Sequence, residues 1–279
     1  MKHIKEPYKS EQLKKILHPF ISQWFFSKFK SFSLPQLFGV MEIHQRKNVL
    51  ISAPTGATKT LTGFMSILNE LIDSGEKGIL EDKTYAVYIS PLKALGNDIF
   101  INLTQPLKEI EKIAEKRLGI RVAVRTGDTT PAEKSKMLKK PPHILITTPE
   151  SLGIVLTSIK FSNHLKDVQW CIIDEIHSLA ENKRGVDLSL SMERLQQISP
   201  AMCRIGLSAT VAPLDEIAKY LVGYTKKSGE WKLRPVGIVD IQFLKEMDLK
   251  VISPVKDLVQ VDFMLKHNSM YKLMDKLIQ

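Results

Sequence analysis

The amino-acid sequence predicts an α/β fold in which a mostly parallel sheet is sandwiched between helices. Short, continuously apolar segments alternate with segments of helical periodicity, as expected for strands that are buried on both faces. A glycine-containing loop ending in Lys59-Thr60 follows one apolar segment, and a carboxylate pair follows a later one. In a parallel sheet both would lie at the carboxyl ends of strands, where such folds bind their ligands.

Composition bounds the class of protein. The 279 residues, 43% hydrophobic and 25% charged, predict a soluble chain with one large domain or two small ones. The net charge of +10 favours a polyanionic partner but also suits an ordinary soluble surface. Cys171 and Cys203 are isolated in apolar runs, which argues against a disulfide framework or a metal cluster and favours a reducing compartment. Without a long apolar run or a signal peptide, we expect no membrane contact and a cytoplasmic or nucleoid-associated location.

Residues 1–34 are predicted to form a helical extension. Its apolar residues fit one or two amphipathic helices, broken at Pro19. This extension would either cap the core or bind a partner.

The alternating elements follow from residue 35 to residue 225. Strands are predicted at 49–51, 85–89, 121–124, 144–147, 170–173 and 203–207. Helices are predicted at 35–45, 60–73, 92–118 and 131–139, from 149 onward, and at 185–198, with a loop at 73–75 and a turn at 126–128. In residues 226–279 the regularity fades into a turn or disordered loop at 226–229, short strands at 236–241 and 250–252, and a lone amphipathic helix at 270–279.

The segment from Ala53 to Thr60 approaches the phosphate-binding pattern G-x-x-x-x-G-K-[ST], whose backbone N–H groups surround phosphates that the lysine neutralises. Ala53 replaces the first glycine, and Thr58 replaces the glycine before Lys59. Glycine there can adopt a positive φ, which would cost a β-branched residue about 1–2 kcal/mol. We hypothesise that Thr58 weakens nucleotide binding or forces an altered, collapsed loop.

A carboxylate pair, Asp174-Glu175, follows the apolar run 171–173. Nucleotide hydrolysis needs one acid to hold Mg²⁺ and another to orient and deprotonate a water molecule. Asp174, joined by the Thr60 hydroxyl, fits the first role and Glu175 the second. In isolation the two could be exposed loop acids, but that interpretation leaves the upstream Lys59-Thr60 unexplained.

These motifs, in this order, resemble those of the superfamily 2 helicases. The loop resembles motif I, residues 88–95 resemble motif Ia and residues 147–152 resemble motif Ib. Motif II is resembled by Asp174-Glu175-Ile176-His177, and motif III by Ser208-Ala209-Thr210. Gln36, upstream of the loop, resembles the glutamine of the Q-motif. Three segments look most like the large helicase-related (Lhr) family. They are Ser90-Pro91-Leu92-Lys93-Ala94-Leu95, the Asp-Glu-Ile-His box and Asn182-Lys183-Arg184-Gly185.

The resemblance implies a RecA-like P-loop NTPase domain that uses ATP and Mg²⁺. Gln36 would read the adenine, with Phe29 or Phe32 as a stacking ring unless these rings only pack in the core. The nucleotide would further contact Thr55, Gly56, Ala57, Thr58, Lys59, Thr60 and Asp174; Lys59 and Glu175 would be catalytic, and His177, Ser208 and Thr210 would couple the nucleotide state to a neighbouring domain.

The resemblance also implies a nucleic-acid interface, formed by Pro91, Lys93, Arg125, Thr148, Pro149 and Glu150. Physical chemistry supports part of it, because a threonine cap followed by Pro149 opens a helix whose free N–H groups favour phosphate. The expected partner is single- or double-stranded nucleic acid, DNA more than RNA, with low sequence specificity.

A second RecA-like domain, in cis or in trans, is the other expected partner. It would supply arginine fingers, which contribute about 10³ to 10⁵ in rate. Residues 226–279 suit a linker and the start of such a domain, yet no arginine lies in the last 20 residues. We therefore expect negligible ATP hydrolysis and no unwinding by this chain alone.

Two other interpretations compete with the ATP-binding half of a helicase. The chain could be a non-catalytic nucleic-acid-binding or adaptor module that keeps the fold. It could also be a complete nucleotide-binding enzyme of another kind, but motifs Ia and Ib would then be unexplained.

Overall fold

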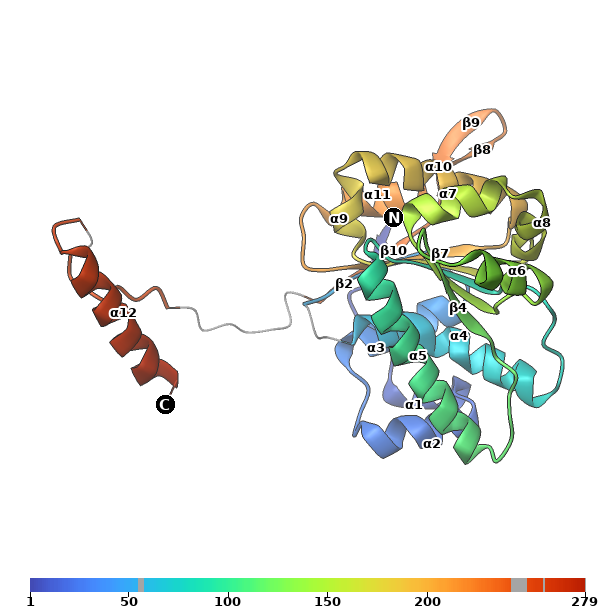
Figure 1. Ribbon diagram of the computed structural model, residues 1–279, viewed down its shortest axis with the longest axis horizontal. Helices are drawn as coiled ribbons and strands as arrows, with labels where there is room; N and C mark the ends of the chain where they lie inside the picture. The colour runs from blue at the N-terminus through green and yellow to red at the C-terminus, as the bar shows by residue number, and fades with distance from the viewer. Residues whose placement is uncertain (55–57, 242–249, 258, 279) are drawn as a thin grey trace. The chain divides into compact units, whose positions relative to one another are not determined.

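The computed structural model describes residues 1–54, 58–241, 250–257 and 259–278. The chain forms two compact units, Met1–Phe243 and Leu244–Gln279, which are described separately. The first unit confirms the predicted α/β fold with a parallel sheet between two layers of helices (Figure 1).

Eight parallel strands make up the sheet of the first unit, in the order β1-β10-β2-β7-β6-β3-β5-β4 within the described part of the chain. Their bounds are β1 Lys2–His3, β2 Val49–Ser52, β3 Ala86–Ile89, β4 Val122–Arg125, β5 Ile144–Thr147, β6 Trp170–Ile173, β7 Cys203–Ser208 and β10 Gly237–Asp240. The central strands are buried on both faces, which explains why they are apolar at nearly every position.

Helices cover both faces of the sheet. One face carries α1 Ser10–Ile16, α2 Pro19–Lys28, α3 Leu34–His44, α4 Lys59–Glu76 and α5 Lys93–Ile113. The other carries α7 Pro149–Thr157, α8 Ile159–Ser162, α9 Ile176–Ala180, α10 Lys183–Ile198 and α11 Leu214–Val222, while α6 Pro131–Lys139 follows β4 and the 3-10 turn Asn163–Leu165 precedes β6. Strand residues alternate between the two cores: Ile51 packs with the first set and Leu50 with the second.

The N-terminal helices belong to the first unit. Pro19 is the first residue of α2, so the predicted break at this proline is confirmed. Leu13 of α1 and Phe25 of α2 are fully buried in the same core as α4. These two helices therefore cap the core, and the alternative that they bind a partner stays a prediction.

The predicted loop at 73–75 is wrong, because α4 continues to Glu76. A Cβ on Gly75 would lie 2.5 Å from the Leu118 carbonyl oxygen. This glycine permits a close approach between two backbones, whereas the sequence interpretation treated it as a helix breaker.

The region after residue 221 agrees with the sequence interpretation only in part. The turn or disordered loop predicted at 226–229 is a turn at Ser228-Gly229, which connects the strands of an antiparallel hairpin, whereas Lys226 and Lys227 belong to its first strand. The two strands are β8 Tyr224–Lys227 and β9 Glu230–Leu233. The expected strand at 250–252 is not a strand. The C-terminal helix, α12 Phe263–Ile278, begins earlier than expected and buries none of its described residues.

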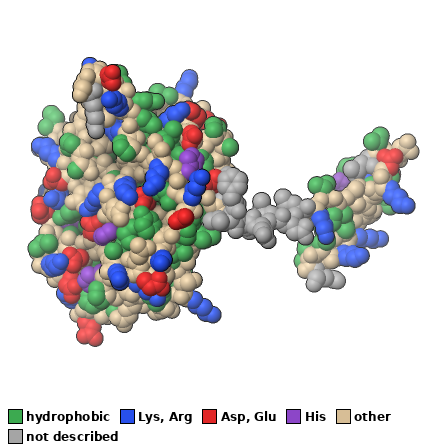
Figure 2. Space-filling view, turned by 180° about the vertical axis from the view of Figure 1, so that it is seen from behind, with side chains coloured by type: hydrophobic (Ala, Val, Ile, Leu, Met, Phe, Trp, Pro, Cys, Tyr) green, Lys and Arg blue, Asp and Glu red, His purple; other side chains and the backbone are tan. Residues whose placement is uncertain are grey.

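The sheet extends beyond the predicted domain boundary at 225/226, because β10 pairs with β2 and the first compact unit ends at Phe243. The assignment of the later residues to the start of a second RecA-like domain stays a prediction. On the face of the first unit that Figure 2 shows, positive and negative side chains are interspersed, so the net charge does not gather there in a single basic patch.

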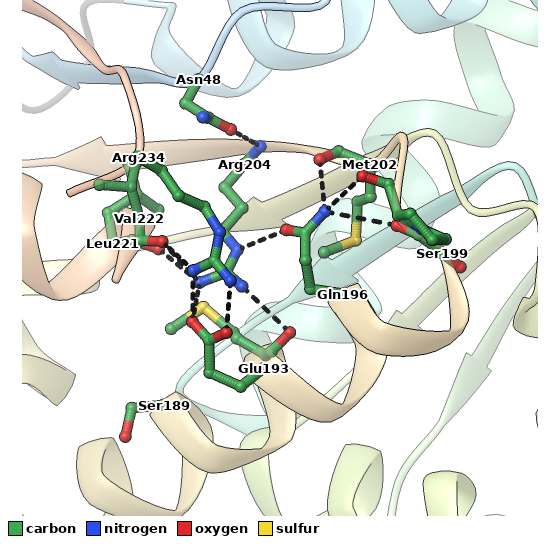
Figure 3. A network of polar contacts seen from close by, with 12 residues as sticks. Asn48, Ser189, Glu193, Gln196, Ser199, Met202, Arg204, Leu221, Val222 and Arg234 are labelled. Atoms are coloured by element: carbon green, nitrogen blue, oxygen red, sulfur yellow. Dashed lines mark hydrogen bonds and ion pairs between the residues drawn. The ribbon is translucent and has the colours of Figure 1, made fainter. Parts of the chain in front are cut away.

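A buried arginine ties α10, α11 and β7 together (Figure 3). Arg204 is 1% exposed, and its guanidinium donates to the carbonyls of Leu221 and Val222 at 3.2 Å each. Glu193 of α10 accepts from Arg204 at 3.1 Å and, through both carboxylate oxygens, from Arg234 at 2.6 Å. Because Arg234 follows β9, this network also fixes the base of the hairpin.

Candidate nucleotide and nucleic-acid site

The candidate site residues lie along one edge of the sheet, at the carboxyl ends of six neighbouring strands. Apart from Gln36, which lies in α3, the predicted nucleotide residues lie at or after the ends of β2, β7 and β6, which are adjacent in the sheet. The predicted nucleic-acid residues follow the next three strands, β3, β5 and β4. Strand order thus divides this edge into two halves that meet between β6 and β3.

Lys59 is the first residue of α4 and lies directly above the end of β2. Its side chain is nearly buried, and Nζ donates to the carbonyl oxygens of Ala53 at 2.7 Å and Pro54 at 3.1 Å. Burial lowers the pKa of Lys59, and the carboxylates of Glu175 and Asp174 oppose this shift. Predicted contacts from Thr55, Gly56 and Ala57 lie outside the described residues.

Thr58 has φ +59° and ψ +22°, the left-handed torsion expected of the glycine that usually occupies this position. Its hydroxyl lies 2.6 Å from the hydroxyl of Ser33, the residue that precedes α3. This hydrogen bond joins the phosphate loop to the start of the helix that carries Gln36.

The carboxylate pair follows β6 as predicted. Asp174 is 5% exposed; its Oδ1 accepts from the Glu175 backbone N–H at 3.0 Å, and its Oδ2 accepts from the Tyr88 hydroxyl. Burial raises the pKa of Asp174, while the Tyr88 hydrogen bond and the Lys59 cation act in the opposite direction. Glu175 has φ +45°, a strained torsion of the kind that clusters at functional sites.

The donor set fits a magnesium ion bound together with a nucleotide. Mg²⁺ usually takes one or two protein oxygens and completes its shell with waters and phosphates. Asp174 supplies a carboxylate that the Tyr88 hydroxyl holds, and Thr60, the second residue of α4, supplies a hydroxyl oxygen. Across the described ranges, no group of three or more His, Cys, Asp or Glu residues could form a metal cage by itself.

His177 connects the ends of β6 and β7. Its Nδ1 lies 3.2 Å from the Ser208 hydroxyl and accepts from the Ala209 backbone N–H at 3.3 Å, while Nε2 lies 3.4 Å from Glu175 Oε2. Two of the three predicted coupling residues are therefore in contact with each other. Thr210 is exposed and lies just beyond them.

Gln36 is 1% exposed and has a structural role at the start of α3. Its Oε1 accepts from the Ser33 backbone N–H at 2.8 Å, and Ser33 and Gln36 form a capping box. The spacing Ser-x-x-Gln is the sequence signal that predicts this role. A part of Gln36 in adenine recognition stays a prediction.

Of the two candidate stacking rings, Phe32 packs in the core and Phe29 lies beside the phosphate loop. Phe32 is 6% exposed and stacks on Phe25 at 5.0 Å between ring centroids. Phe29 is 36% exposed and lines a cavity of about 360 Å³ that Thr58 and Thr60 also line.

The nucleic-acid half of the edge contains ionic and aromatic contacts. Lys93 is exposed and pairs with Asp128 at 2.6 Å. The Arg125 guanidinium lies 4.3 Å from the centre of the Phe161 ring, and burial lowers the pKa of Arg125. Thr148 caps α7, accepting from the Ser151 backbone N–H at 3.4 Å.

Arg184 is a residue whose role sequence reasoning missed. Its Nε donates to Glu150 at 2.6 Å, and its Nη2 donates to the Pro91 carbonyl oxygen at 2.6 Å. Hydrogen bonding to Arg184 lowers the pKa of Glu150. The signal was present in Asn182-Lys183-Arg184-Gly185, which had served only to mark the family. Arg184 thus links the two predicted nucleic-acid segments and neutralises the carboxylate between them.

A parallel sheet with a phosphate-loop segment after β2 and a carboxylate pair after β6 defines a RecA-like domain. The chain belongs to the DEAD/DEAH box helicase family, whose model matches residues 35–217. It is 52% identical over 275 residues to the ATP-dependent helicase Lhr-Core of Methanothermobacter thermautotrophicus, covering 98% of this chain and 31% of the relative. The Lhr-Core helicase of Methanocaldococcus jannaschii is 50% identical over 284 residues, covering 100% of this chain and 32% of the relative.

A solved structure of Mycobacterium smegmatis helicase Lhr bound to ssDNA and AMP-PNP matches with a TM-score of 0.72 and 35% identity, covering 94% of this chain and 32% of that one. These matches confirm the predicted resemblance to the Lhr helicases. The chain spans about a third of the length of these relatives. Within the described ranges, none of the helices combines the length and apolar character needed to cross a bilayer.

Proposed function

We propose that this chain is the ATP-binding half of an ATP-dependent DNA or RNA helicase, acting on Mg·ATP and on the backbone of a nucleic-acid strand. The observation that carries the proposal is the division of the sheet edge. Lys59 follows β2, and Asp174 and His177 follow β6, on the two sides of β7, while Lys93 and Thr148 follow the next two strands, β3 and β5. Such an arrangement suits two ligands bound side by side.

In this function Lys59 neutralises the β- and γ-phosphates, beside the N-terminus of α4. Asp174 and Thr60 hold the magnesium ion, which when bound neutralises charge that develops on the phosphate oxygens. Glu175 orients the attacking water and accepts its proton. The His177–Ser208 contact passes the state of this site to the neighbouring β7 loop.

The nucleic-acid half binds phosphates through helix N-terminal N–H groups and Lys93, without reading bases. The similar Mycobacterium smegmatis helicase Lhr was solved bound to ssDNA, which supports DNA over RNA as the partner of this chain. A cytoplasmic location, as expected from the sequence, is part of the same proposal.

The first experiment measures the affinity of the chain for a fluorescent ATP analogue with Mg²⁺ and for single-stranded DNA and RNA. Lys59→Ala should reduce nucleotide affinity by about tenfold or more, the effect of about 1.4 kcal/mol. Lys77→Ala, at the other end of α4, is the charge-matched control. Equal nucleotide affinity in the wild type and Lys59→Ala would contradict the proposal.

A second experiment tests the nucleic-acid half through Arg184. Arg184→Ala removes three hydrogen bonds, two to Glu150 and one to the Pro91 carbonyl oxygen, and leaves the Glu150 carboxylate without its cation beside the bound phosphates. We expect single-strand affinity to fall by about tenfold, given about 1.5 kcal/mol for such charged contacts. Arg117→Ala, an exposed site after α5, removes the same charge and should have little effect; equal losses in both variants would indicate a nonspecific charge effect.

The third experiment concerns turnover. Alone, the chain should hydrolyse ATP negligibly, and a second RecA-like domain added in trans should restore nucleic-acid-stimulated hydrolysis. Normal hydrolysis by the chain alone contradicts this dependence. Intact nucleotide and strand binding with no rescue favours the alternative of a non-catalytic adaptor.

A further inference from the structure

We propose that Tyr88 is a positioning residue for the divalent cation, because its hydroxyl holds the side chain of Asp174. This inference rests on the proposed function and deepens it. Tyr88 belongs to β3, the strand whose end begins the nucleic-acid half, and no pattern in the sequence indicates a role for it in metal binding.

The Tyr88 ring is clamped in the core. Tyr88 is 0% exposed, and its backbone pairs with Ile172 of β6, two residues before Asp174. Its ring stacks on Phe64 of α4, with 5.1 Å between ring centroids and 18° between ring planes. Strand β3 and helix α4 together therefore set the direction in which the hydroxyl points.

The hydroxyl contacts one of the two proposed metal ligands. It donates to Asp174 Oδ2. The other Asp174 oxygen, Oδ1, is held by the Glu175 backbone N–H at 3.0 Å. Each carboxylate oxygen thus has its own donor, which fixes the rotation of the carboxyl group about its last side-chain bond.

Fixing that rotation matters because Mg²⁺ requires nearly octahedral geometry. A carboxylate that must first be ordered therefore binds Mg²⁺ with lower affinity. Groups that hydrogen-bond a metal ligand typically change metal affinity by about 10- to 100-fold. Phenylalanine keeps the ring and loses the hydrogen bond to Asp174.

The test compares Tyr88→Phe with Tyr85→Phe. Tyr85 lies just before β3, far along the strand from Asp174, and its hydroxyl accepts from the Glu81 backbone N–H at 3.0 Å. Binding of a fluorescent ATP analogue is measured against Mg²⁺ concentration and again in EDTA. We expect Tyr88→Phe to raise the half-saturating Mg²⁺ concentration by about tenfold or more, with the affinity in EDTA unchanged. Tyr85→Phe should match the wild type in both measurements.

An unchanged Mg²⁺ requirement in Tyr88→Phe, with Mg²⁺-dependent binding by the wild type, overturns this inference and leaves the proposed function intact. A lower requirement also overturns it, because the hydroxyl would then compete with the cation. If the wild type shows no Mg²⁺-dependent binding, the proposed function fails and the inference fails with it.

Tyr88→Leu serves as a second variant without the hydroxyl, and thermal unfolding checks that both variants fold. The same shift in Mg²⁺ requirement in both supports a role of the hydroxyl. If neither variant folds, Tyr88 has a purely structural role and the inference is overturned.

Discussion

Thr58→Gly tests the balance of forces at the phosphate loop. Glycine relieves a left-handed torsion that costs a threonine about 1–2 kcal/mol. It also loses the Ser33–Thr58 hydrogen bond, about 0.5–1.5 kcal/mol, and gains chain entropy in the unfolded state, about 0.4–1 kcal/mol. These terms nearly cancel, so the free energy of unfolding of Thr58→Gly should stay close to that of the wild type.

Thr58→Ala separates the terms, because it loses the same hydrogen bond and keeps the torsional cost. We expect the glycine variant to be more stable than the alanine variant by about 1 kcal/mol, the reverse of their order inside a helix. Urea denaturation measures this difference, and in thermal unfolding it corresponds to about 2–4 °C for a chain of this size. An alanine variant at least as stable as the glycine variant would refute the reasoning.

The effect on nucleotide binding is a separate matter. The torsional cost is present in the fold itself and therefore belongs to the free energy of folding. The hypothesis that Thr58 weakens ATP binding then depends on its side chain, which lines the cavity beside the loop. Thr58→Gly should raise the affinity for Mg·ATP, and an unchanged affinity would show that the loop tolerates the threonine.

Three further predictions concern stability. Gly185→Ala places a Cβ 1.9 Å from the Leu179 carbonyl oxygen and should cost about 3 kcal/mol in urea denaturation. Glu193→Gln leaves the buried Arg204 cation without its carboxylate; because Glu193 is partly exposed, we expect a loss of about 2–3 kcal/mol. Burial lowers the pKa of His143 to about 4. In the unfolded chain this histidine binds a proton near pH 6.5. The free energy of unfolding should therefore fall by up to about 3 kcal/mol as the pH falls from about 6.5 to about 4. His143→Gln should flatten stability against pH over that window.

Matched controls accompany these variants. Gly153→Ala meets only the Ser191 hydroxyl, at 3.5 Å, and should be tolerated. Equal losses for the two glycine variants would contradict the steric argument. His267→Gln, in the second unit, should leave the pH profile unchanged. If the stability of His143→Gln still falls between about pH 6.5 and pH 4, other titrating groups cause the loss.

The central strands were predictable because both of their faces are buried, which favours an apolar residue at every position. The carboxylates after β6 were predictable because they end an apolar run, and the lysine after β2 was predictable from the phosphate-loop pattern. Contacts between side chains far apart in the sequence were not. Nothing in the local pattern indicates that Tyr88 reaches Asp174 or that Arg184 reaches Pro91, because these contacts depend on strand order.

Glycine was also ambiguous in sequence. Gly75, next to Ser74, is typical of a turn, yet it lies near the end of α4, where its missing side chain permits a close contact with the Leu118 backbone. Gln36 shows the converse problem, because one residue satisfies both a family motif and a capping box. A local sequence pattern thus identifies a residue type, but the role of that residue depends on its contacts in the tertiary structure.

Strand β3 is common to the binding sites of the two proposed ligands. Tyr88, inside the strand, holds Asp174, and three residues further on Pro91 is held by Arg184, a separation of about 10 Å along an extended chain. Strand β3 therefore connects the residue that holds the carboxylate to a loop that we propose binds nucleic acid. Thermodynamic linkage requires any coupling between the two proposed ligands to be reciprocal: by whatever factor ATP changes the affinity for nucleic acid, nucleic acid changes the affinity for ATP.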